Sequence, residues 1–194
     1  MSRRSYMALL PWMMFAFVAR AGGQGATWAA MAALAGLVLV AASERRVDGV
    51  SGFTQASIAL AAGLAAIAIA VGGQAFEPWA RCAAALGLSA IAAASVGGVP
   101  FIEHYARELV PPGTVGTPRF RATTRAIARI WAVAFAWAAG SFLVAAIMDH
   151  PLAATMFNWV VPALVLLKAS ERAGRLWDLH FGEEPGGIYG LFEV

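Results

Sequence analysis

The residues best suited to chemistry lie in two short polar stretches between long apolar runs. Arg119, Arg121, Arg125 and Arg129 form one stretch, and the last three are four residues apart, so a helix would place them in one row. Thr117-Pro118 suits the start of that helix, with Thr as the cap and Pro at the first position. Arginines at a membrane boundary bind anionic headgroups, so the row predicts contact with lipid or with a partner. Nucleic acid is not expected, because the stretch is short and carries no reader motif.

The second polar stretch holds Glu103, His104, Arg107 and Glu108, and its spacing allows two side-chain pairs on one helical turn. Glu103 and Arg107 are four residues apart, as are His104 and Glu108. A histidine beside a carboxylate can perform acid–base chemistry or bind a metal, whereas the alternative is a salt-bridged helix at the membrane interface. A metal needs further ligands that the neighbouring sequence does not supply, and no nucleotide-binding or hydrolase motif is present. We therefore expect no catalytic residue, no cofactor and no metal.

The composition indicates whether these polar stretches belong to a soluble protein or to a membrane protein. Of the 194 residues, 60% are hydrophobic and 13% are charged. A soluble domain averages about 25% charged residues and could not bury so much apolar surface at this size. The sequence therefore predicts an all-α polytopic bundle of transmembrane helices. Residues 1–175 form this single bundle, and residues 176–194 form a cytoplasmic tail.

Six apolar runs are candidate spans, because about 20 helical residues cross the hydrocarbon layer. The first is short, is interrupted by Pro11-Trp12, and is closed by Arg20. It also has an alternative interpretation as a cleaved signal peptide, with Arg3-Arg4 as the basic region. The polar residues from Pro100 to Ala128 are expected to connect the fourth and fifth spans. The six spans lie near residues 6–20, 26–43, 53–73, 80–99, 130–148 and 151–167.

The basic residues predict the orientation of these spans. With six spans and both termini in the cytoplasm, the fourteen Lys and Arg residues divide twelve to two in favour of the cytoplasmic side. The arginine row belongs to this majority, so topology alone is a sufficient explanation for it. The two outer residues are Arg20 and Arg81, and the twelve inner ones are Arg3, Arg4, Arg45, Arg46, Arg107, Arg119, Arg121, Arg125, Arg129, Lys168, Arg172 and Arg175.

The spans themselves carry few polar side chains, and Asn158 in the last is the most notable. A buried amide there is expected to hydrogen-bond to a neighbouring helix. Small residues at four-residue spacing let helix backbones approach closely, in a compact bundle or in an oligomer. Examples are Ala59 and Gly63 in one span and Ala83 and Gly87 in the next.

The layout resembles the intracellular septation protein A family, also called the inner membrane-spanning protein family of bacteria. The resemblance covers residues 5 to 175 in order and spacing, and the chain departs from it at Thr123-Thr124 and beyond Arg175. It implies a bacterial inner-membrane protein linked to envelope integrity and cell division, with no established catalytic residues. The residues that carry it are Leu9-Leu10-Pro11, Phe15, Phe17, Gly22-Gly23, Ala26-Thr27, Pro100-Phe101, Tyr105-Ala106-Arg107-Glu108, Pro118, Phe120-Arg121, Trp131, Phe135 and Gly140.

Three functions are compatible with the sequence. The preferred one is a non-enzymatic inner-membrane protein that contributes to envelope integrity and division through anionic lipid headgroups on the cytoplasmic side or through other envelope proteins. The second is an accessory subunit of a larger membrane complex. The third is a small transporter or lipid-modifying enzyme, which requires Glu103, His104 and Asn158 to converge around a cavity.

Overall fold

The computed structural model describes residues 3–19, 24–46, 49–148 and 151–182, and the side chains from Leu9 onward. Throughout these ranges the chain is helical apart from turns and short connections. Five helical segments are long and apolar enough to cross a membrane, and we treat the chain as a multi-pass helical membrane protein. The elements are α1 (Arg3–Val18), α2 (Gly25–Arg45), α3 (Gly52–Val71), α4 (Gly73–Val96), α5 (Phe101–Ala106), the 3₁₀ turn η1 (Arg107–Leu109), α6 (Pro118–Ile147), α7 (Pro151–Thr155), the π-helical turn η2 (Met156–Val160) and α8 (Val161–Phe181).

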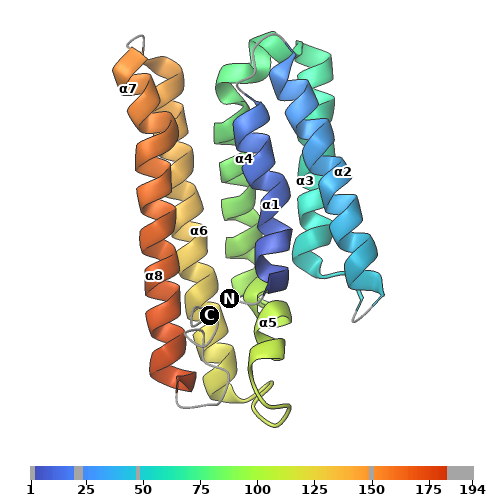
Figure 1. Cartoon of the computed structure of the whole chain (residues 1–194), viewed down its shortest axis with the longest axis vertical. Helices are drawn as coiled ribbons and strands as arrows, with labels where there is room; N and C mark the ends of the chain where they lie inside the picture. Colours follow the sequence, from blue (N-terminus) through green and yellow to red (C-terminus); the bar gives the residue numbers. More distant parts are fainter. Residues whose placement is uncertain (1–2, 20–23, 47–48, 149–150, 183–194) are drawn as a thin grey trace, which may run out of the picture.

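The long helices run up and down in chain order, and α4 joins the two halves of the bundle. Figure 1 shows α1 to α4 grouped on one side and the pair α6 and α8 on the other. The most extensive contact is between α4 and α6, and α8 packs against α6. One end of the bundle, called the basic end below, holds the start of α1, the end of α2, α5, the first turns of α6 and the last turns of α8. The opposite end holds α7 and the turn between α3 and α4.

The first predicted span corresponds to α1, which is shorter than the other candidates. Among its described side chains the apolar part is Leu9–Val18, which by itself is shorter than the length that crosses a membrane. The helix is nevertheless part of the bundle, because Trp12 and Phe15 are buried in the main core. Gly36 of α2 lets α1 approach closely, since a Cβ there would lie 3.2 Å from Cγ of Pro11.

Small residues bring α3, α4 and α6 together as the sequence predicts for a membrane bundle. Gly87 of α4 lies so close to Leu60 of α3 that a Cβ at position 87 would meet the end of the Leu60 side chain, which would have to move. Ser89 of α4 donates a hydrogen bond to the Ala132 carbonyl of α6 at 2.9 Å. Gly63 is different, because no atom lies within 4 Å of the place where its Cβ would be. Within the chain, therefore, Gly87 serves helix packing and Gly63 does not.

The segment predicted as a polar connection, Pro100 to Ala128, is largely helical and packed. It forms α5, η1 and the first third of α6, which begins at Pro118 as predicted and continues without a break into the span predicted from residue 130. The Thr117 hydroxyl accepts the Phe120 amide at 3.2 Å, which confirms the predicted cap. Helix α8 likewise continues to Phe181, into the range predicted as tail. The apolar composition marked the lipid-facing part of each helix, but the helices themselves extend beyond it.

The contact between Gly87 and Leu60 generates a test of the bundle. Gly87→Val should destabilise the protein by about 1–3 kcal/mol, because the added side chain overpacks the α3–α4 contact. Gly63→Val is the matched control on open surface and should change stability by less than about 0.5 kcal/mol. Thermal unfolding of both variants in the same detergent measures the difference. Leu60→Ala in the Gly87→Val background should restore part of the lost stability. Equal destabilisation by Gly87→Val and Gly63→Val would contradict this packing.

Candidate functional site

The predicted arginine row lies on the exposed side of α6 at the basic end. Arg119, Arg121, Arg125 and Arg129 are all exposed. Arg119 places its guanidinium 5.7 Å from the centre of the Phe181 ring of α8, a cation–π contact. The helix brings the four side chains to one end of the bundle as expected. Since all four side chains are exposed, their charge is accessible from the surroundings.

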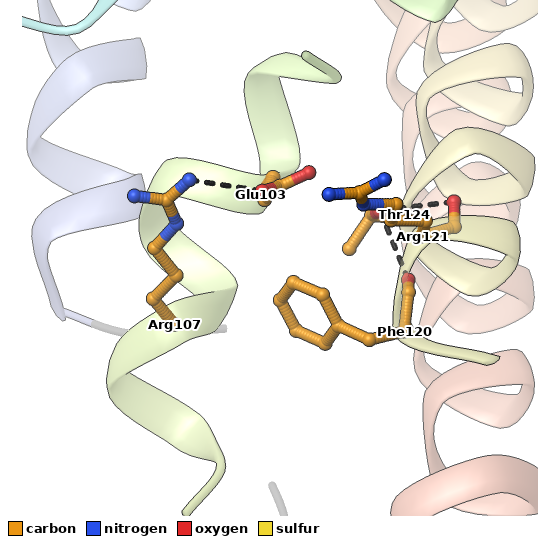
Figure 2. A network of polar contacts seen from close by, with 5 residues as sticks. All are labelled: Glu103, Arg107, Phe120, Arg121 and Thr124. Atoms are coloured by element: carbon orange, nitrogen blue, oxygen red, sulfur yellow. Dashed lines mark hydrogen bonds and ion pairs between the residues drawn. The ribbon is translucent and has the colours of Figure 1, made fainter. Parts of the chain in front are cut away.

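Two neighbouring helices hold this part of α6 in place. Phe120 is fully buried and meets Trp177 and Phe181 of α8 edge-on, at 6.4 Å and 6.2 Å between ring centres. On its other side α6 packs against α5. Figure 2 shows the Arg121 guanidinium pointing from α6 toward Glu103 of α5. The first third of α6 is thus clamped between α5 and α8, which fixes the arginine row to the bundle.

The second predicted cluster is brought together only in part. Glu103 is buried and forms an ion pair with Arg107 at 2.9 Å, which confirms the predicted four-residue pair (Figure 2). His104 instead packs edge-on against the Tyr105 ring at 5.2 Å. The pairing of His104 with Glu108 stays a prediction. Among the described residues, no group of three or more His, Cys, Asp and Glu side chains is placed to hold a metal ion.

The residues of the transporter or enzyme alternative do not converge. Glu103 and His104 lie on α5 at the basic end, whereas Asn158 lies in η2, next to α7 at the opposite end (Figure 1). Asn158 is buried beside the point where the Ser141 hydroxyl of α6 donates to the Phe157 carbonyl at 2.6 Å. The neighbourhood of Asn158 therefore contributes to helix association.

A buried polar cluster that the sequence did not reveal lies at the basic end around Glu44. Glu44 Oε2 accepts the Ser51 amide at 2.9 Å. Its Oε1 accepts the hydroxyls of Thr54 at 2.9 Å and Tyr105 at 3.3 Å. Three donors satisfy the buried carboxylate and tie the end of α2, the start of α3 and α5 together. The only local signal was Ser51, which caps α3.

Arg81 was assigned to an outer loop, but its side chain is buried within the bundle. It is 7% exposed, and its guanidinium lies 5.3 Å from the centres of both the Phe142 and the Trp159 rings. These aromatic faces stabilise a cation that hydrocarbon would disfavour. The sequence gave no sign of the two rings, because they lie on other elements, Phe142 on α6 and Trp159 in η2.

A groove of about 880 Å³ runs between α6 and α8. Its basic part is lined by Arg129 of α6 and by Lys168, Arg172 and Arg175 of α8. Its apolar part is lined by residues of both helices that lie nearer the middle of the bundle, among them Val133, Trp137 and Leu164. Of these charged residues only Arg129 belonged to the predicted row. Lys168, Arg172 and Arg175 were counted only among the twelve basic residues of the cytoplasmic side, since nothing local in the sequence pairs them with α6.

With this geometry in view, the chain was compared with known proteins. No protein-family model, no curated protein and no solved structure matches it. The candidate sites therefore rest on the physical arrangement of the chain's own residues.

Burial of the Tyr105 phenol generates a pH prediction. Burial, reinforced by the charge of Glu44, raises the pKa of Tyr105 to about 12 from an ordinary value of 10.0. Below pH 10 both folded and unfolded chains keep the proton. Between pH 10 and about 12 the unfolded chain releases it first, so the free energy of unfolding should fall across this range.

Unfolding of the detergent-solubilised protein at stepped pH measures this effect, and Tyr105→Phe is the control that should flatten this part of the profile. Tyrosinate absorbance should also show a late step that Tyr105→Phe removes. If the step that Tyr105→Phe removes lies near pH 10, the buried position is contradicted.

Proposed function

We propose that this chain is a non-enzymatic bacterial inner-membrane protein that acts by binding anionic lipid headgroups through its basic end. The observation that carries the proposal is the exposed arginine row on the first third of α6, held by Phe120 and by α5. A negatively charged leaflet attracts such residues by roughly 1 kcal/mol each. Because the row is fixed to the bundle, these attractions are not reduced by the entropy cost of ordering a flexible segment on binding.

The length of α6 supports contact at the membrane surface. Its thirty residues extend about 45 Å, whereas the hydrocarbon layer is about 30 Å thick. The part after Arg129 is apolar and accounts for most of that layer. The part from Pro118 to Arg129 then lies at the level of the headgroups and beyond. The positive-inside rule assigns this end, where α1 begins and α8 ends, to the cytoplasmic side.

A role in envelope integrity and cell division follows from the proposed lipid contact and from the family resemblance. The transporter or lipid-modifying alternative is less well supported, because Glu103 and Asn158 lie at opposite ends of the bundle. Catalysis would need reacting groups within hydrogen-bond reach of one another. Lipid contact needs only the surface charges that α6 presents.

An accessory subunit of a larger membrane complex is the second candidate, and the outer face of α3 favours it. Ala59, Gly63, Ala66 and Ala70 are all exposed on this helix. Small residues at this spacing allow a helix of another subunit to approach closely. Extraction in a mild detergent should then yield a heteromer that Gly63→Val disrupts, whereas recovery of the chain alone would remove this candidate.

The lipid proposal is tested by the double variant Arg121→Gln and Arg125→Gln. The relative binding constant for anionic over zwitterionic lipid should fall severalfold, since each lost charge is worth about 1 kcal/mol near the surface. Quenching of tryptophan fluorescence by brominated lipids in reconstituted full-length protein measures this constant. The matched control replaces the same two arginines by lysine and should keep the preference. A preference unchanged in the glutamine variant, or unaffected by added salt, would contradict the proposal.

A further inference from the structure

The groove between α6 and α8 has a basic part and an apolar part. Its basic part presents four cations from two helices, Arg129, Lys168, Arg172 and Arg175. Its apolar part continues along the same helices toward the middle of the bundle. A ligand that fits both parts must carry negative charge at one end and hydrocarbon at the other.

The charges of the groove indicate more than one negative group on the ligand. Glu171 also lines the groove, and its carboxylate pairs with Lys168 at 2.9 Å and approaches Arg175 at 3.8 Å. One of the four positive charges is thereby balanced, and a surplus of three remains. A single phosphodiester carries one negative charge and would leave most of this surplus uncompensated. The exposed side chains of Lys168 and Arg175 can reach a phosphate that enters the groove.

The apolar part of the groove matches an acyl chain in size and position. From Arg129 to Trp137 the α6 backbone rises about 12 Å, which is the length of a substantial part of a lipid tail. Val133, Trp137 and Leu164 are each more than half exposed, so this surface is available within the membrane. A lipid bound with its headgroup at Lys168 and Arg172 would lay a tail along these side chains.

We infer that the α6–α8 groove is a specific site for an anionic phospholipid that carries two phosphates, of the diphosphatidylglycerol class. The inference rests on the proposed function and deepens it, because it adds one defined site to the general preference for anionic lipid. Basic pockets between membrane helices on the cytoplasmic side bind this lipid class in membrane proteins generally. Here the separation of the cations along α8, from Lys168 to Arg175, spreads them over two helical turns, enough for two phosphates.

Native mass spectrometry of the full-length protein in detergent tests the site by counting bound lipids during titration. Diphosphatidylglycerol should bind one molecule per chain at a concentration at least tenfold below phosphatidylglycerol. Lys168→Gln with Arg172→Gln should weaken the first binding event about tenfold or more, since two surface charges are lost. Arg121→Gln with Arg125→Gln removes the same charge outside the groove and should leave this first event within about twofold.

A substitution in the apolar part of the groove distinguishes a lipid ligand from a free anion. Leu164→Asn keeps every charge and should still weaken diphosphatidylglycerol binding several-fold, and inorganic pyrophosphate should not compete for the site. Circular dichroism and thermal unfolding verify that each variant keeps the fold. Three results would each overturn the proposed site. Diphosphatidylglycerol and phosphatidylglycerol could bind with the same affinity per phosphate group, the two double charge variants could weaken binding equally, or pyrophosphate could compete with the lipid. If the groove site fails this test but the Arg121 and Arg125 variant still loses its general preference for anionic lipid, the proposed function stands. If that variant also keeps its preference, the groove site and the proposed function are both wrong.

Discussion

A hydrocarbon layer supplies no hydrogen-bond partners, so every backbone amide and carbonyl that enters it must be satisfied within a helix, and charged side chains must lie at the helix ends or be stabilised locally. The rest of this structure follows from that constraint. Long apolar helices pack through small residues such as Gly87, and most of the described arginines lie on segments that meet at one end. The one buried cation among the described helices of the opposite end, Arg81, lies against two aromatic rings.

The basic end is the part of the molecule where helices continue beyond their apolar sequence. There the packing changes from small residues to aromatic rings and buried hydrogen bonds. Phe120 fixes α6 to the last turns of α8, while Glu44 joins α2, α3 and α5 through three donors. Both contacts order elements that carry exposed cations, and a preorganised set of cations binds an anionic headgroup with less loss of side-chain freedom than a flexible loop would.

Much of the fold was predictable because its main signal, the length of apolar runs, is local in sequence. Five long helices, the Thr117 cap and the Glu103–Arg107 pair follow from composition and spacing. The contacts that define the sites are not local. Tyr105 reaches Glu44 across sixty-one residues, and Lys168 shares a groove with Arg129 only because α6 and α8 pack side by side. Apolar runs also understate helix length: the span was predicted to begin near residue 130, whereas α6 is one continuous helix from the predicted cap at Thr117.

The central claim is that the bundle crosses the membrane with all of its clustered cations at one face. Cysteine labelling in intact bacteria tests it most directly, because the single native cysteine, Cys82, is buried and can be replaced by serine. Cysteines introduced by Arg125→Cys and Leu179→Cys should react with an impermeant maleimide only after the cells are opened, and Gln74→Cys should react in intact cells. Labelling of positions 125 and 179 from opposite sides of the membrane would contradict the account.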